Sequence, residues 1–152
     1  MSHEENISSS VLRADLLVGA VLIPGAKSPN LVTEPMIRRM RPGSVVVDVS
    51  IDQGGCIETS RLTSHDRPVL LKHGVLHYGV PNIPGAVSNT STYALTNVTL
   101  RYGRAIAGLG LEEAVRRDEA LCKGVNVYKG RITHPAVADA VGEKSADVLS
   151  LI

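Results

Sequence analysis

Residues 44–55 read SVVVDVSIDQGG, a β-branched run that ends on Asp52 and turns at once through one glutamine and two glycines. Most of the run suits a strand that is buried on both faces, as strands of parallel α/β sheets are. Ligands of such sheets bind at the carboxyl ends of the strands. Asp52 is therefore the first candidate for a functional residue, with the stabilisation of a turn as its alternative role.

Two further segments extend this strand into a sheet. Residues 16–23 form a continuous apolar run that stops at a Pro-Gly pair, which indicates another strand. Residues 33–43 predict a helix between these two strands, with Thr33 as its N-cap and a Pro-Gly stop. Residues 74–80 predict a third strand that ends in a proline-rich turn. If the strands are parallel neighbours, the segments VLIPG, SIDQGG and VPNIPG lie side by side at one edge.

The rest of the chain is mostly helical. Residues 88–109 carry apolar side chains at helical spacing, and residues 112–123 predict a second helix with opposite charges four residues apart. A short hairpin around Lys129-Gly130 and a last short helix before Gly142 follow. Residues 1–10, MSHEENISSS, form a polar leading segment that predicts no element. The pattern as a whole is typical of an α/β fold.

Composition excludes some partners. Sixteen lysines and arginines against fifteen aspartates and glutamates give a net charge of +1, and neither sign forms a long block. This balance predicts no nucleic-acid and no membrane partner. No apolar stretch approaches the ~20 residues that span a bilayer. The two cysteines form no dense framework, which predicts reduced thiols in a cytosolic protein.

Other polar residues favour structural roles. Asp48 lies inside the predicted strand, where a buried carboxylate needs hydrogen-bond partners from a loop or a helix end. His73 and His77 have the spacing of a helical metal pair, but the glycines beside them favour a strand, so no metal site is predicted. Cys56 has no base next to it in sequence and is expected to be inert. The chain also lacks a GxGxxG or Walker loop, so it carries strand ends for a nucleotide without a phosphate cradle.

Two long segments carry a family resemblance. Residues 14–55, ADLLVGAVLIPGAKSPNLVTEPMIRRMRPGSVVVDVSIDQGG, and residues 73–97, HGVLHYGVPNIPGAVSNTSTYALTN, resemble the C-terminal part of NAD-dependent alanine dehydrogenases. The resemblance runs from about Val11 to Gly142. The alpha subunit of proton-translocating nicotinamide nucleotide transhydrogenases is similar in architecture, but the DQGG and NTSTYALTN runs favour the alanine dehydrogenase branch.

The resemblance implies a domain organisation and a site. Residues 11–88 would be a partial NAD-binding domain, the second half of a Rossmann-like parallel sheet, and residues 89–152 a C-terminal helical segment that packs towards a substrate domain. Asp52 matches the catalytic aspartate of the family, and Ile83 stands where many relatives carry methionine. The implied NAD contacts are Val21, Leu22, Val49, Ser50, Ile51, Asp52, Arg61, Val80, Pro81, Asn82 and Ile83.

The implied reaction is the oxidative deamination of L-alanine with NAD and water, which gives pyruvate, ammonium and NADH in the cytoplasm. The substrate domain and the glycine-rich phosphate loop of the family have no counterpart in the sequence, so we expect the chain alone to be inactive, with alanine and pyruvate held by that other domain. A homo-oligomer, hexameric as in the family, or a complementary N-terminal chain is the expected partner. The alternatives are a non-catalytic folding or interaction module from a truncated gene, and a piece of a transhydrogenase alpha subunit.

Overall fold

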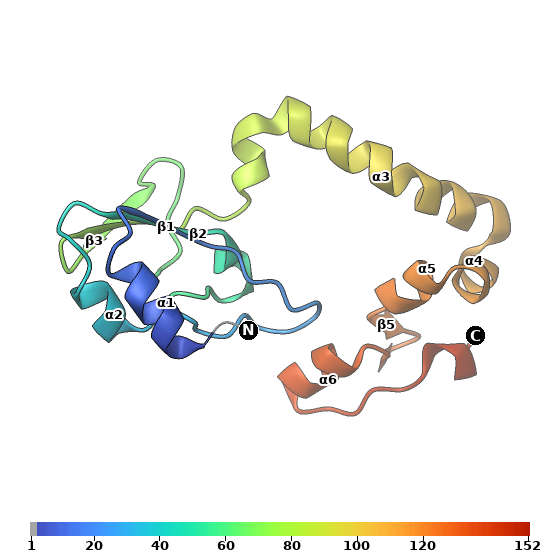
Figure 1. Cartoon of the computed structure of the whole chain (residues 1–152). Coiled ribbons are helices and arrows are strands. Elements are labelled where there is room, and N and C mark those ends of the chain that lie inside the picture. The colour runs from blue at the N-terminus through green and yellow to red at the C-terminus, as the bar shows by residue number, and fades with distance from the viewer. Residues whose placement is uncertain (1–2) are drawn as a thin grey trace. The chain divides into compact units, whose positions relative to one another are not determined.

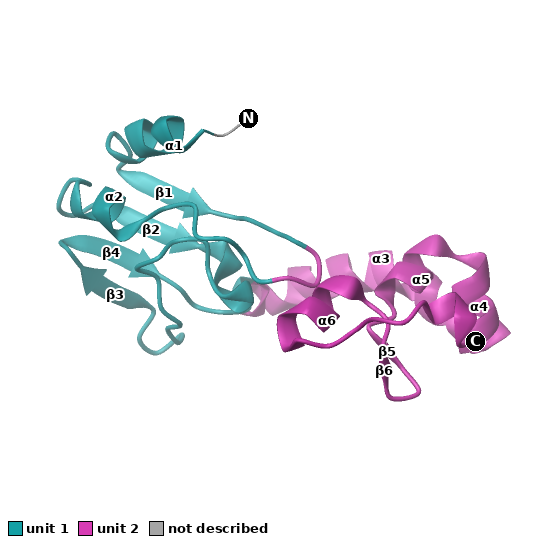
Figure 2. Ribbon diagram, turned by 90° about the horizontal axis from the view of Figure 1, so that it is seen from below, with its two compact units in different colours: residues 1–23, 27–83 teal, residues 24–26, 84–152 magenta. Residues whose placement is uncertain are grey.

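The computed structural model describes residues 3–152, which fall into two compact units. Unit 1 runs to residue 23 and continues over residues 27–83, and unit 2 comprises residues 24–26 and 84–152 (Figure 2). Unit 1 holds the sheet and the two helices that pack against it. Unit 2 holds a long helix and several short elements.

The sheet of unit 1 has four strands in the order β1-β2-β4-β3. They are β1 (Leu16–Gly19), β2 (Val45–Asp48), β3 (Val69–Lys72) and β4 (Val75–Tyr78). β1, β2 and β4 are parallel neighbours, and β3 pairs antiparallel with β4. The predicted α/β class and the parallel arrangement of the three predicted strands are therefore confirmed.

The sequence did not predict strand β3. It is joined to β4 by a two-residue turn, His73-Gly74, in which both residues have positive φ values of 54° and 77°. Such a turn is the hairpin connection whose twist matches that of the flanking strands. Its usual signal is Asn-Gly or Asp-Gly, and a histidine in the first position hides it.

Two helices cover one face of the sheet (Figure 1). They are α1 (Glu4–Val11) and α2 (Glu34–Arg38), and their buried side chains join Val46 of β2 and Val75 of β4 in one core cluster. Helix α1 corrects the expectation that the first ten residues form no element. Its two acidic residues favour the N-terminal turn, and Val11, only 2% exposed, anchors its other end to the core.

The strands end earlier than the apolar runs suggest. β2 was predicted to continue to Ile51 but ends at Asp48, because the Asp48 carboxylate accepts a hydrogen bond from the Ser50 amide and starts the 3₁₀ helix η1 (Val49–Gln53). β1 ends at Gly19, where a Cβ atom would overlap the Cys56 sulfur. The chain beyond each strand therefore forms a turn at the edge of the sheet.

The 3₁₀ helix η2 (Ile83–Val87) crosses the boundary between the units, since Ile83 belongs to unit 1 and its other residues to unit 2. The 22-residue helix α3 (Ser88–Leu109) follows in unit 2. Its remaining elements are α4 (Leu111–Arg117), α5 (Glu119–Gly124), β5 (Val127–Tyr128), β6 (Arg131–Ile132), α6 (Pro135–Val141) and η3 (Val148–Ser150). The predicted hairpin around Lys129-Gly130 is confirmed.

One predicted helix of unit 2 is divided. The helix expected over residues 112–123 breaks at Asp118, which has extended backbone angles and whose carboxylate caps α5 through the amides of Ala120 and Leu121. The unit packs around Val115, Tyr128 and Val148. Among residues 3–152, no helix combines the length and the apolar character that crossing a membrane requires.

Candidate functional site

The first strand end is fixed to the second by a serine hydroxyl. Ser50 Oγ accepts a hydrogen bond from the Val21 amide at 2.6 Å and donates one to the Val21 carbonyl at 2.8 Å. Ser28 Oγ donates to the same carbonyl at 3.2 Å. Both serines are buried, so these bonds are shielded from water. The backbone of the segment after β1 is thereby held beside η1.

Asp52 joins the second strand end to the third. It lies in η1 with its side chain exposed, and its Oδ2 accepts a hydrogen bond from the Asn82 amide at 3.2 Å. Asn82 adopts a left-handed backbone with φ 51°, a conformation that asparagine tolerates better than most residues. The three strand ends that the sequence predicts to be adjacent are therefore linked by Ser50 and Asp52.

A second aspartate supports this loop from inside. Asp48 is fully buried, and its carboxylate accepts hydrogen bonds from the amides of Ser50 at 3.1 Å, Cys56 at 3.1 Å and Ile57 at 3.2 Å. This is the structural role that the sequence predicts for it. Cys56 is 1% exposed, and burial raises the pKa of its thiol, which keeps the sulfur protonated and unreactive as expected.

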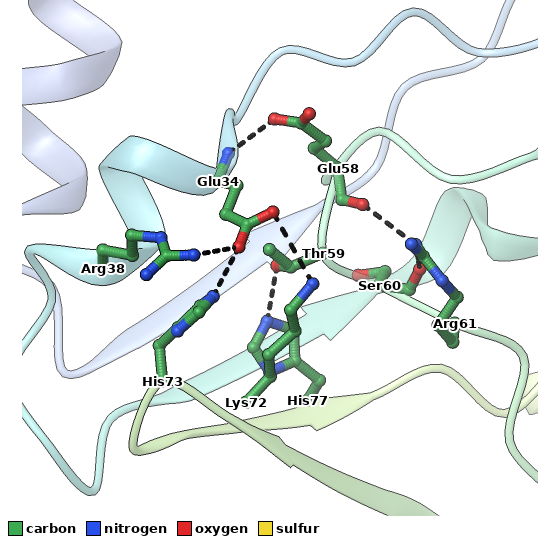
Figure 3. A network of polar contacts seen from close by, with 9 residues as sticks. All are labelled: Glu34, Arg38, Glu58, Thr59, Ser60, Arg61, Lys72, His73 and His77. Carbon is green, nitrogen blue, oxygen red and sulfur yellow. Dashed lines mark hydrogen bonds and ion pairs between the residues drawn. The ribbon is translucent and has the colours of Figure 1, made fainter.

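Arg61 reaches the site through its backbone. A Cβ atom at Gly79 would overlap the Arg61 carbonyl oxygen, so the chain after β4 and the Arg61 segment are in close contact. The Arg61 guanidinium donates instead to the carbonyls of Glu58 at 2.9 Å and Ser60 at 2.6 Å (Figure 3). The side chain is exposed, so a ligand can compete for its remaining donors.

A polar network on α2 lies beside this loop (Figure 3). Glu58 Oε2 accepts a hydrogen bond from the Glu34 amide at 2.6 Å, whereas Thr33, the predicted cap, makes no side-chain cap bond. The Glu34 carboxylate contacts His73 at 2.7 Å and Arg38 at 2.8 Å, and these contacts, led by His73, lower its pKa. Thr33 therefore occupies the predicted N-cap position, but the side chain that bonds the first turn comes from Glu58, in the loop that carries Arg61.

The two histidines considered as a metal pair have separate partners. His77 is 1% exposed and is bonded to Thr59 Oγ1 at 2.7 Å and to the Val75 carbonyl at 3.0 Å, while His73 contacts Glu34. Within residues 3–152 the structure brings together no group of three histidine, cysteine, aspartate or glutamate side chains that could hold a metal ion.

The eleven predicted cofactor contacts differ in what they expose. Leu22, Val49, Asp52, Arg61 and Asn82 have exposed side chains, and Val21, Pro81 and Ile83 are half-buried. Ser50, Ile51 and Val80 are buried. A ligand at this edge would therefore meet apolar side chains, one carboxylate, one amide and one guanidinium, and would touch the buried three only through their backbone.

Sequence reasoning missed two supporting residues. Ser28 was not singled out, although it shares the Val21 carbonyl with Ser50. Gly79 was noted only as a sign of a strand, although a side chain there would collide with the Arg61 backbone. Neither has a local sequence signal, because both roles depend on segments at least seven residues away.

Comparison with known proteins matches this chain to one family and to several alanine dehydrogenases. The family model described as alanine dehydrogenase/PNT, C-terminal domain, matches residues 1–135. The alanine dehydrogenase of Methanococcus maripaludis is 59% identical across 92% of this chain and 38% of its own length. That of Lysinibacillus sphaericus is 56% identical across 100% of this chain and 41% of its own length.

Solved structures agree with the sequence comparison. An L-alanine dehydrogenase matches with a TM-score of 0.77 and 50% identity, over 93% of this chain and 39% of its own. A transhydrogenase from Sinorhizobium meliloti matches with a TM-score of 0.54 and 31% identity, over 59% of this chain and 25% of its own. The chain thus spans about 40% of the length of the alanine dehydrogenases that it matches.

Proposed function

Because this chain belongs to the alanine dehydrogenase/PNT C-terminal domain family, we propose that it is the C-terminal part of an NAD-dependent alanine dehydrogenase. The whole enzyme would convert L-alanine, NAD and water to pyruvate, ammonium and NADH. The observation that carries the proposal is the joined edge of the sheet, where Ser50 and Asp52 hold three parallel strand ends together. This is where a Rossmann-type sheet, the fold of this chain, binds its nucleotide.

The exposed groups at that edge fit the nicotinamide end of NAD. Leu22 is 69% and Val49 44% exposed, and both offer apolar surface for a flat ring. The Asn82 side-chain amide supplies a donor and an acceptor for a carboxamide. The diphosphate has no glycine-rich cradle within the chain, so the proposed site is half of a cofactor site. Ser50, Ile51 and Val80 would contribute through backbone groups, and Arg61 through its free donors.

Asp52 is the proposed catalytic residue. When bound, NAD supplies the hydride acceptor for the reaction. The carboxylate of Asp52 is exposed at the strand end, and the Asn82 amide fixes one of its oxygens at 3.2 Å, which leaves the other oxygen to accept or relay a proton from water or substrate. Orientation by a backbone donor is what a proton-relay carboxylate requires.

The alanine dehydrogenase branch is favoured over a transhydrogenase. The transhydrogenase structure matches only 59% of this chain at 31% identity, whereas the alanine dehydrogenases match at least 92% of it at 50% identity or more. We further propose that the chain is inactive alone. It would act in the cytoplasm as part of a homo-oligomer, a hexamer as the resemblance implies, or with a complementary N-terminal chain.

A chimaeric enzyme tests the proposal. The N-terminal portion of the Lysinibacillus sphaericus alanine dehydrogenase, up to its first matched residue, is fused to this chain. We expect alanine-dependent NADH formation, with Asp52→Asn lowering kcat by about 10²–10⁴-fold and leaving the KM for NAD nearly unchanged. Asp66→Asn, at an exposed loop position, is the matched control. A folded but inactive chimaera, or an Asp52→Asn enzyme with normal turnover, would contradict the proposal.

A further inference from the structure

Residues 57–60 form a tight turn that is attached to the sheet from inside. The Ser60 amide donates a hydrogen bond to the Ile57 carbonyl at 3.0 Å, which closes the turn. Thr59 is 0% and His77 1% exposed, and Thr59 Oγ1 lies 2.7 Å from His77 Nε2 (Figure 3). Because His77 belongs to β4, the turn has a buried attachment to the strand beside it.

The direction of this hydrogen bond follows from the other nitrogen of the ring. His77 Nδ1 lies 3.0 Å from the Val75 carbonyl, which can only accept, so Nδ1 carries the proton. Burial lowers the pKa of His77, which keeps the ring neutral at pH 7. Nε2 is then an acceptor, and the Thr59 hydroxyl donates to it. A valine at this position could not make the bond, whereas a serine could.

The turn holds Arg61 through two carbonyl groups. The carbonyls of Glu58 and Ser60, the neighbours of Thr59, accept from the same Arg61 nitrogen, Nη1, at 2.9 and 2.6 Å. Both N–H groups of Nη1 are thereby used, and Nε and Nη2 keep their donors along one edge of the planar guanidinium. Within residues 3–152, Arg61 takes part in no ion pair. A positively charged, forked edge therefore remains for a ligand.

We infer that Thr59 is a positioning residue for Arg61: its buried bond to His77 fixes the turn whose carbonyls hold the guanidinium, so that the Nε–Nη2 edge can receive two phosphate oxygens of NAD. This inference rests on the proposed function and deepens it, because Thr59 itself touches no ligand. A forked guanidinium edge matches phosphate oxygens bidentately. A long side chain that is already held in place loses less entropy on binding, which corresponds to about 2–10-fold in affinity.

The position of Arg61 is measured in this chain by ¹⁵N NMR of the side chain. We expect Thr59→Val to lower the order parameter of the Arg61 Nε–H bond towards the values below about 0.6 that mark flexible groups. Thr59→Ser should leave it unchanged. Ser44→Ala is the matched control, because it removes a different buried hydroxyl, which donates to the Ala14 carbonyl at 3.4 Å. An unchanged order parameter in Thr59→Val, or an equal fall in Ser44→Ala, would overturn the inference.

The consequence for the cofactor is measured in the chimaeric enzyme. We expect Thr59→Val to raise the KM for NAD about 2–10-fold, with kcat and the KM for alanine nearly unchanged. Thr59→Ser should retain the original KM. In an Arg61→Met background, Thr59→Val should have no further effect, because it acts through the guanidinium.

The outcomes separate this inference from the proposed function. An equal rise of the KM for NAD in both backgrounds would overturn the inference, because Thr59 would then act by another route. A rise in the KM for alanine alone would overturn the assignment of Arg61 to the phosphates of NAD. An inactive chimaera would contradict the proposed function, and the order parameter of Arg61 in the free chain would then decide by itself whether Thr59 positions the guanidinium.

Discussion

The buried carboxylate of Asp48 is the most sensitive point of unit 1, and its replacement by asparagine should be costly. Its two oxygens accept from three backbone amides, those of Ser50, Cys56 and Ile57. The asparagine amide keeps only one acceptor oxygen and turns its NH₂ group towards an amide donor. Since a buried donor without a partner costs about 1–3 kcal/mol, we expect Asp48→Asn to lower the free energy of unfolding by about 2–4 kcal/mol.

This loss is a large part of the about 5–15 kcal/mol that typically stabilises a domain. Urea unfolding followed by circular dichroism measures it, and hydrogen exchange locates it. A loss of about 2.8 kcal/mol would speed exchange of the three amides by about 100-fold. Asp66→Asn on an exposed loop should change the free energy of unfolding by less than about 0.5 kcal/mol. If Asp48→Asn has the same urea midpoint and exchange rates as Asp66→Asn, the three hydrogen bonds do not support the loop as described.

Three further predictions concern the backbone, pH and the cofactor. Gly79→Ala should lower the urea midpoint of unfolding because its Cβ would overlap the Arg61 carbonyl oxygen. Gly108→Ala, with open space around it in helix α3, should raise the urea midpoint and increase the free energy of unfolding by about 0.5–1 kcal/mol. Burial lowers the pKa of His77 below its ordinary 6.5, so the unfolded chain binds the proton more readily than the folded chain. The free energy of unfolding should therefore fall as pH drops from 6.5 towards the folded pKa. Urea titrations at several pH values measure this dependence, and His77→Gln should remove it. Calorimetric titration of the chain with NADH should show no binding heat, and saturable heat would reject the half-site.

The sequence predicted the three parallel strands and the turns that follow them because both depend on local patterns. Continuous β-branched runs such as VVVD are typical of buried strands, and the Pro-Gly and Gly-Gly pairs that follow them stop any ladder. The position of Asp52 beyond the second strand followed from the same reasoning. The prediction that the three ends meet needed only the rule that parallel strands end at one edge.

What the sequence did not show depends on contacts between distant segments. Glu58 caps α2 from 24 residues away, and it replaces Thr33, which has the right residue type in the right place. Helix α1 forms in a polar segment because Val11 reaches the core of the sheet. The strands are shorter than predicted for the same reason. β1 ends where Gly19 lies against the Cys56 sulfur, and β2 ends where Asp48 accepts a hydrogen bond from the Cys56 amide.

The hydrogen bonds of the site form one connected path, which links its stability to its chemistry. Asp48 holds the Ser50 amide, the Ser50 hydroxyl holds both backbone groups of Val21, and Asp52, two residues further on, holds Asn82. The buried aspartate therefore positions the exposed one through η1. A change at Asp48 should consequently impair catalysis in the chimaera without touching any ligand, and a change at Asp52 should impair it without loss of stability. The two carboxylates lie four residues apart in sequence, and their difference in burial separates the structural role of Asp48 from the chemical role that we propose for Asp52.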